Sequence, residues 1–218
     1  MISVIIPTWN AERDLPRCFD SLISGVVSGV VREVIVADMG SSDATLAIAD
    51  AAGAHVVKSD RSRGSAMAAG AAVARSDWLL FLHPETALAG GWETEANAFL
   101  ERSTLERPRA AAFRFALEDF GGRARRKEMF AAARSALFGL PYGDQGLFVP
   151  KRFYLKLGGH QPSAMEDVDL IRRIGRTRLV VLRARAINKV SDEGHRSTLL
   201  ALLHAIRVPR ALVSFIGG

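Results

Sequence analysis

Short unbroken apolar runs alternate with segments of helical apolar spacing through the first 82 residues of the chain. A short apolar run bounded by a proline or a polar residue is typical of a buried strand, and apolar residues three or four positions apart are typical of a helix. Strands are therefore predicted at residues 3–7, 34–37, 55–57 and 78–82. Helices are predicted between them at residues 12–23, 43–52 and 65–74. This alternation predicts a parallel sheet with helices on both faces.

The second half of the chain continues the pattern less regularly. Further strands are predicted at residues 110–117, 147–150 and 179–182. Further helices are predicted at residues 128–138, 151–157 and 166–174. We therefore expect an α/β fold. It consists of one Rossmann-like domain over residues 1–190, with a mostly parallel central sheet flanked by helices, and a C-terminal amphipathic helical tail over residues 191–218.

Polar residues gather where three of the predicted strands end. Thr8 and Asn10 follow the first strand, residues 38–43 follow the second, and residues 83–86 follow the fourth. In open parallel sheets, ligands bind beyond the carboxyl ends of the strands. The sequence therefore predicts a functional cleft at this edge of the sheet.

Composition and charge narrow the class of protein. Of the 218 residues, 49% are hydrophobic and 24% are charged, which suits a full core and excludes a disordered chain. Only 7% are aromatic, and no recognition motif accompanies the basic residues, so we expect no nucleic-acid partner. Cys18 is the single cysteine, so no intrachain disulfide can form, and no basic leader precedes the first strand. These features predict a cytoplasmic location.

The charge is unevenly divided. Residues 1–100 hold 7 Lys and Arg against 12 Asp and Glu, whereas residues 151–218 hold 13 against 5. A basic half can bind anionic lipid or a phosphate-bearing substrate, or can simply be a solvated face. The apolar stretch at residues 197–216 is too interrupted by polar residues to span a bilayer. It can lie on a membrane surface or dock on protein, so peripheral contact with the inner face of the membrane stays open.

Several segments resemble the family 2 glycosyltransferases. Ser3–Asn10 is similar to the opening strand and loop of that family, and Glu33–Asp43 is similar to its second strand, aspartate and Gly-Ser-Ser-Asp turn. Residues 81–86 fall where the family has its metal-binding acidic motif. Resemblance to the acceptor-side half lies in residues 143–149, 158–159 and 165–170. The resemblance covers residues 2–185 and is closest to a short bacterial subgroup whose metal motif begins with histidine.

This resemblance implies a GT-A fold and transfer of a sugar from a nucleotide-diphosphate donor to an acceptor hydroxyl. Residues 1–100 would bind the UDP- or GDP-sugar, and residues 101–190 would bind the acceptor, with lipid-linked and small-molecule acceptors both open. Asp38 can accept a hydrogen bond from a uracil-type imide or a ribose, or can be a turn former. Asp43 can equally favour a first helical turn, and Arg63 can be a solvated arginine. The implied donor-binding residues are Pro7, Thr8, Asn10, Asp38, Ser41, Asp43 and Arg63.

The diphosphate implies a divalent metal, Mn²⁺ or Mg²⁺, with His83 and Glu85 as ligands. Residues two positions apart after a strand can point the same way, and manganese accepts imidazole as well as oxygen ligands. Glu85 stands where the family has aspartate, and Pro84 stands where it has a small residue. The altered motif leaves weakened metal binding as an open alternative.

The resemblance places a general base at Asp167, beside Glu166, in an inverting reaction. The pair can instead favour the positive end of the helix that follows. Asp144 and Gln145 would contact the acceptor or the donor sugar, or would support the loop. A Gln-x-x-Arg-Trp motif of processive members is absent from the sequence, which favours a single transfer.

Ala66 and Ala68 replace two polar donor contacts of the subgroup. Together with Pro84 and Glu85, they motivate an alternative function. In this alternative the chain is a degenerate, non-catalytic domain that binds a nucleotide or a protein partner. A nucleotidyltransferase is disfavoured, because Pro7–Asn10 is not a glycine-rich phosphate loop.

Overall fold

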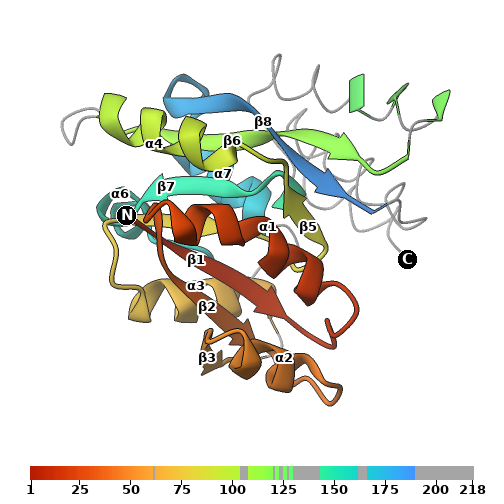
Figure 1. The fold of residues 1–218 in the computed structure, drawn as a ribbon. Helices are drawn as coiled ribbons and strands as arrows, with labels where there is room; N and C mark the ends of the chain where they lie inside the picture. The colour runs from red at the N-terminus through yellow and green to blue at the C-terminus, as the bar shows by residue number, and fades with distance from the viewer. Residues whose placement is uncertain are drawn as a thin grey trace, which may run out of the picture.

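The computed structural model describes residues 1–60, 62–103, 108–119, 121–122, 125–126, 128–129, 143–161 and 166–189. These residues form an α/β structure around an eight-stranded sheet of order β3-β2-β1-β4-β7-β6-β8-β5 (Figure 1). The strands are β1 (Ile2–Thr8), β2 (Val31–Asp38), β3 (His55–Lys58), β4 (Trp78–Phe81), β5 (Thr86–Leu88), β6 (Ala110–Leu117), β7 (Leu147–Pro150) and β8 (Leu179–Asn188). All seven predicted strands are present, and β5 is an additional one.

The described helices follow most of the predicted segments. The α-helices are α1 (Leu15–Val27), α2 (Thr45–Ala51), α3 (Arg63–Val73), α4 (Trp92–Arg102), α6 (Lys151–Lys156) and α7 (Glu166–Ile174). Two 3₁₀ turns are η1 (Gly143–Gln145) and η2 (Arg176–Arg178). Most of the helix predicted at residues 128–138, and all of the tail predicted at 191–218, lie outside the described residues. None of the described helices is long and apolar enough to cross a membrane.

The sheet is mostly parallel, as predicted. β1 runs parallel to β2 and β4, β2 to β3, and β6 to β8. β7 is antiparallel to its neighbours β4 and β6, and β5 is antiparallel to β8. Because β1, β2 and β4 are parallel, the loops that follow them leave the sheet at one common edge.

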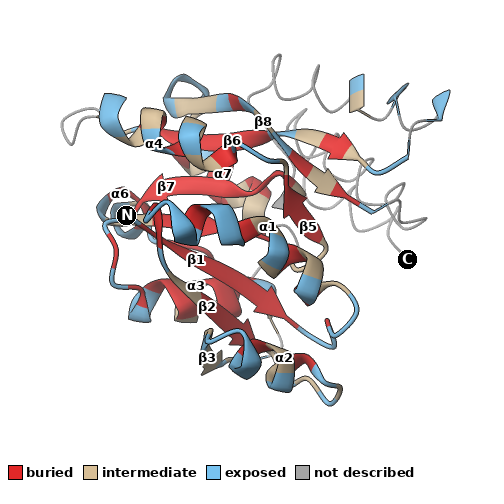
Figure 2. Ribbon diagram, in the orientation of Figure 1, coloured by how far each residue is buried: buried red, intermediate tan, exposed pale blue. Residues whose placement is uncertain are grey.

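The alternation of side chains along β1 divides the core between the two faces of the sheet. Ile6 belongs to a buried cluster with Leu15 of α1 and Trp92 of α4. Ile5 points to the other face and belongs to a cluster with Met67 of α3. Figure 2 shows the central strands almost wholly buried between these helical layers. Burial on both faces explains why these strands are apolar without interruption.

Two glycines let α3 approach its neighbours closely. A Cβ atom added to Gly70 would lie 2.5 Å from Ile5 Cγ2, so α3 sits directly on β1. A Cβ atom added to Gly64 would lie 2.6 Å from the Gln161 carbonyl oxygen and 3.3 Å from Glu166 Cβ. The start of α3 is therefore packed against the start of α7, which brings the two halves of the chain together at the cleft.

Candidate active site

The loops after β1 and β2 are joined through the carboxylate of Asp38. Its Oδ1 accepts hydrogen bonds from the Thr8 hydroxyl at 3.1 Å and the Ser41 hydroxyl at 2.5 Å. Its Oδ2 accepts from the backbone amides of Gly40 and Ser41, both at 2.9 Å. Burial raises the pKa of Asp38, but these four hydrogen bonds lower it by more than burial raises it. The pKa of Asp38 therefore lies below its ordinary value. Asp38 therefore acts here as the turn former that its position allowed.

A second set of bonds fixes the outer part of the same loops. The Asn10 side-chain oxygen accepts from the Ser42 amide at 2.8 Å, and the Asn10 amide donates to the Ser41 hydroxyl at 2.9 Å. Asn10 has a φ of 51°, a left-handed conformation that asparagine tolerates. Asp43 Oδ2 accepts from the Glu12 amide at 3.1 Å. The predicted donor-binding residues after β1 and β2 thus form one connected, preorganised surface, with Pro7 buried in β1 beneath it.

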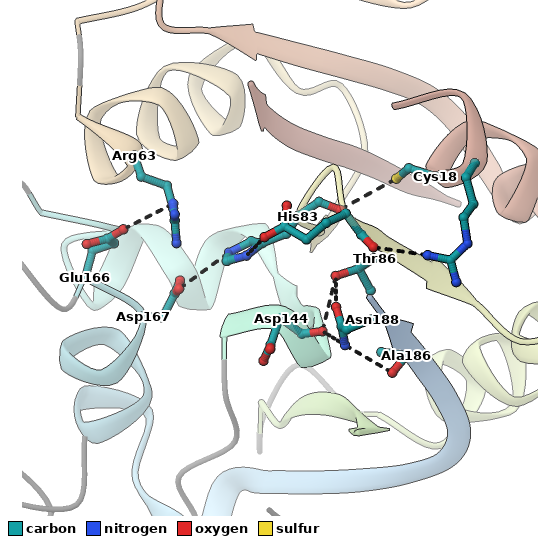
Figure 3. Close-up of polar contacts among 11 residues, drawn as sticks. Cys18, Arg63, His83, Thr86, Asp144, Glu166, Asp167, Ala186 and Asn188 are labelled. Atoms are coloured by element: carbon teal, nitrogen blue, oxygen red, sulfur yellow. Dashed lines mark hydrogen bonds and ion pairs between the residues drawn. The ribbon is translucent and has the colours of Figure 1, made fainter. Parts of the chain in front are cut away.

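His83 and Glu85 lie on a tight turn after β4. The Thr86 amide donates to the His83 carbonyl oxygen at 3.1 Å, and the Cys18 thiol lies 3.8 Å from the same oxygen. Arg17 donates to the Glu85 carbonyl oxygen at 3.3 Å. α1 therefore holds the backbone of this turn, and the side chain of His83 points toward Asp167 (Figure 3).

The turn meets the beginning of α7 through Asp167. His83 Nδ1 lies 3.6 Å from Glu85 Oε1, and His83 Nε2 lies 3.6 Å from Asp167 Oδ2 (Figure 3). Both distances suit ion pairs, but Nε2 is buried without a hydrogen-bond partner. The structure thus brings together three of the residues that the sequence singled out for metal binding and base catalysis.

Burial and mutual charge fix the protonation of this cluster. Burial lowers the pKa of His83, but the carboxylates of Asp167 and Glu85 raise it more, to about 10. Burial raises the pKa of Glu85, and His83 lowers it more, to about 2. Burial likewise raises the pKa of Asp167, while His160 and His83 hold it well below its usual range. In the ligand-free molecule an imidazolium therefore lies between two carboxylates.

Asp144 lies beside the Thr86 end of the turn after β4. Its backbone oxygen accepts from the Thr86 hydroxyl at 3.3 Å and the Asn188 amide at 3.0 Å (Figure 3). Its side-chain Oδ1 is buried and has no hydrogen-bond partner. Burial raises the pKa of this carboxyl to about 6, with Glu85 and Asp167 adding to the shift and His83 opposing it. A buried, unpartnered carboxyl at this position is available to a ligand.

The other predicted residues of the second half have mainly structural contacts. Glu166 is buried, and its Oε1 lies 3.8 Å from Arg63 Nε across the mouth of the cleft (Figure 3). Gln145 is buried, and its amide donates to the Phe113 carbonyl oxygen at 2.8 Å. Gln145 thus ties η1 to β6, which is the loop-supporting role that the sequence left open.

Sequence reasoning missed His160 and Tyr154. His160 Nε2 lies 3.3 Å from Asp167 Oδ1, and its Nδ1 lies 3.2 Å from the Tyr154 hydroxyl. Both side chains are buried. The available signal was a histidine placed directly after the Gly158-Gly159 turn and shortly before Asp167.

Within the described part of the chain, no group of three or more His, Cys, Asp or Glu residues has the geometry to hold a metal ion by itself. His83 and Glu85 can therefore supply at most part of a coordination sphere. A divalent cation bound to a diphosphate commonly takes the remaining ligands from phosphate oxygens and water.

Comparison with known proteins agrees with this arrangement. Residues 3–102 match the family model described as glycosyl transferase family 2. A PGL/p-HBAD biosynthesis glycosyltransferase of Mycobacterium tuberculosis is 35% identical over 95 residues, which cover 40% of this chain and 36% of that relative. A glucosyl-3-phosphoglycerate synthase of Mycolicibacterium paratuberculosis is 37% identical over 125 residues, which cover 49% of this chain and 38% of that relative. The matched segments thus span less than two fifths of these relatives.

Solved structures extend the likeness in fold to nearly the whole chain. Glucosyl-3-phosphoglycerate synthase from Mycobacterium tuberculosis, in complex with Mn²⁺, uridine diphosphate and phosphoglyceric acid, superposes with a TM-score of 0.68. Its identity is 22%, over 96% of this chain and 79% of that chain. S. aureus TarS superposes with a TM-score of 0.66 at 17% identity, over 99% of this chain and 42% of that chain. The chain therefore has the GT-A fold, and residues 3–102 are similar to glycosyl transferase family 2.

Proposed function

We propose that this chain transfers a sugar from a nucleotide-diphosphate donor to an acceptor hydroxyl. One observation carries the proposal. At the carboxyl edge of the sheet, His83 from the family-matched half lies 3.6 Å from Glu85 of the same turn and 3.6 Å from Asp167 of the other half. The loops after β1 and β2 end at the same edge and provide a preorganised polar surface for a nucleotide.

The donor nucleotide would bind on the Asn10, Ser41 and Asp43 loops. The carboxylate of Asp38 has about four acceptor positions, and the structure fills them with Thr8, Gly40 and Ser41 donors. Direct contact between Asp38 and a base or ribose therefore requires the Ser41 hydroxyl to rotate away. Arg63, whose side chain is half exposed, is placed to neutralise a diphosphate beside His83 and Glu85.

The residues present fit a divalent cation. His83 Nε2 is a buried nitrogen without a hydrogen-bond partner, and Glu85 is a carboxylate whose side chain is 42% exposed. These two donors, completed by diphosphate oxygens and water, suit Mn²⁺ once His83 gives up one proton as the cation binds, and the carboxylate also suits Mg²⁺. When bound, the cation would neutralise charge on the leaving diphosphate. The Mn²⁺ and uridine-diphosphate complexes of the mycobacterial synthase support this assignment and favour a UDP-sugar over a GDP-sugar.

Asp167 is the proposed general base. Its carboxylate is ionised and its Oδ2 lies on the side of His83, so it would accept the proton of an acceptor hydroxyl as that oxygen attacks the anomeric carbon. Attack from the side opposite the leaving diphosphate would invert the anomeric configuration in a single displacement. Glu166 would act indirectly, by holding Arg63 near the diphosphate. Asp144 would hydrogen-bond to the acceptor or the donor sugar through its unpartnered oxygen.

The proposed function also includes the class of acceptor and the place in the cell where the transfer occurs. One curated relative is named a glucosyl-3-phosphoglycerate synthase, which supports a small-molecule acceptor. We propose one transfer per encounter at the cytoplasmic side, with the basic C-terminal tail at residues 191–218 as a peripheral membrane contact.

Isothermal calorimetry of the chain with UDP and GDP, each with and without Mn²⁺, tests the proposal. Mn²⁺-dependent binding of one nucleotide, followed by hydrolysis or transfer from the matching nucleotide sugar, is the expected result. Binding without turnover of any UDP- or GDP-sugar would instead support the degenerate, non-catalytic domain. An absence of nucleotide binding would overturn both functions.

A further inference from the structure

His160 is buried behind the proposed base. Its side chain is 0% exposed, and its Nε2 lies 3.3 Å from Asp167 Oδ1, a distance that suits an ion pair although the geometry is not that of a hydrogen bond. The ring packs edge-on against Phe81 of β4, with ring centroids 4.6 Å apart. His160 therefore contacts Asp167 from the protein side and cannot reach a substrate in the cleft.

Tyr154 contacts His160 at both its backbone amide and its Nδ1. The Tyr154 hydroxyl oxygen accepts a hydrogen bond from the His160 backbone amide at 2.9 Å. Its own proton is then free to be donated to His160 Nδ1, which lies 3.2 Å away. An imidazole that accepts at Nδ1 carries its proton on Nε2. That Nε2–H is on the side of Asp167 Oδ1.

The backbone around His160 is held by the same helix that carries Asp167. Gly159 has a φ of 62°, and a Cβ atom there would lie 3.0 Å from the Tyr154 hydroxyl oxygen. Arg173 of α7 donates to the Gly159 carbonyl oxygen at 2.7 Å and also to the Leu157 carbonyl oxygen. The turn that presents His160 is thus tied directly to α7, so His160 and Asp167 keep a fixed relative position.

The two oxygens of Asp167 consequently have different surroundings. Oδ1 faces His160, and Oδ2 faces His83 at 3.6 Å. We propose that Tyr154 and His160 form a positioning relay, in which the Nε2–H of His160 attracts Asp167 Oδ1 and so keeps Oδ2 on the side of His83, where the acceptor hydroxyl would bind. This inference rests on the proposed function, because it assigns a support to the base of that reaction.

The protonation state of His160 tests the relay without any substrate. Nitrogen-15 spectra of the five histidines identify His160 by the signals lost in His160→Gln. The expected result is a proton on Nε2 and a bare Nδ1 in the native chain. In Tyr154→Phe, which removes the donor to Nδ1, a second population with a proton on Nδ1 should appear. A proton on Nδ1 in the native chain, or an unchanged spectrum in Tyr154→Phe, would overturn the relay.

Turnover tests the consequence for the base. His160→Phe keeps a ring but removes the donor, and kcat should fall by roughly 10- to 100-fold, as for other supports of a reacting group, with little change in KM for the donor. His160→Gln places an amide N–H where Nε2 lies, and kcat should recover most of the loss seen in His160→Phe. Equal losses in the two variants would show a packing role and overturn the proposal.

The two failures are distinguishable. If the native chain turns over no nucleotide sugar, the proposed function fails. The nitrogen-15 spectra still decide whether the hydrogen bonds of Tyr154 and His160 exist. The Nε2 signal of His160 should also shift in Asp167→Asn, and an unmoved signal would remove the contact on which the inference depends.

Discussion

His83 Nε2 lies 3.6 Å from Asp167 Oδ2, although His83 follows β4 and Asp167 lies in the first turn of α7. This contact joins the half of the chain that matches the family model to the half that the match does not reach. It places a proposed metal ligand beside the proposed base, so the acceptor hydroxyl and the leaving diphosphate can bind close to each other. The four predictions that follow test this arrangement and the fold that supports it.

Asp167→Asn should abolish most of the transfer. The amide cannot take up a proton, and a positioned general base contributes about 10²- to 10⁴-fold, so kcat should fall within that range. Calorimetry should show nucleotide binding close to that of the native chain. Asp20→Asn, on the exposed face of α1, is the matched control and should leave kcat unchanged. Native turnover in Asp167→Asn would remove it as the base.

Glu85→Gln should weaken the metal dependence of nucleotide binding. The change removes a charged oxygen ligand, and the loss in Mn²⁺ affinity should be at least about 10- to 100-fold, the cost of losing an outer partner of a metal ligand. The measurement is a Mn²⁺ titration of UDP binding. Glu101→Gln on α4 is exposed and serves as the charge-matched control. Equal Mn²⁺ dependence in the two variants would contradict a role for Glu85.

Asp38→Asn should destabilise the fold near neutral pH. The side-chain NH₂ of asparagine is a donor and cannot accept hydrogen bonds. It would leave unpaired either the backbone amides of Gly40 and Ser41 or the hydroxyls of Thr8 and Ser41, and the free energy of unfolding should fall by about 1–3 kcal/mol. Because the folded pKa of Asp38 is depressed, its stabilisation is present above the ordinary pKa of an aspartate and is lost as the pH falls through the folded value. Thermal unfolding of the native chain and of Asp38→Asn should show a difference in stability at pH 7 that becomes smaller in acid. A difference that is independent of pH would contradict this origin.

Gly70→Ala should destabilise the chain through overpacking. The new Cβ would lie 2.5 Å from Ile5 Cγ2 in the core between α3 and β1. Overpacking costs about 1–3 kcal/mol, and the better helix propensity of alanine returns up to about 1 kcal/mol. Chemical denaturation should therefore show a net loss of stability. Gly90→Ala, where a Cβ meets nothing within 4 Å, is the control and should be near neutral.

The local sequence carried enough information for most elements of the first half. Apolar runs such as residues 3–7 are buried on both faces, and their short length with a proline at the end favours a strand over a buried helix. The polar groups at Thr8, Asp38 and His83 could also be placed in advance, because the carboxyl ends of parallel strands share one edge. A motif at the start of a predicted helix pointed to Asp167 in the same way.

β5 and the order of the second half depended on tertiary contacts. β5 has only three residues, and its backbone is satisfied by β8 at the far edge of the sheet. β7 lies antiparallel between β4 and β6, a pairing that depends on hydrogen bonds between distant segments rather than on any periodicity. Local pattern fixes which residues are buried, whereas the partner of a strand is chosen by the whole sheet.

The site divides in the same way. The sequence by itself determined the residue types that can bind a nucleotide and a metal, since strand ends and their polar loops are local features. Only the tertiary structure decided that Asp38 accepts hydrogen bonds from its own loops, that Gln145 donates to the backbone of β6, and that His160 lies against Asp167. These roles depend on distances between side chains from separate elements. Such distances are set by how α3, α6 and α7 pack on one face of the sheet.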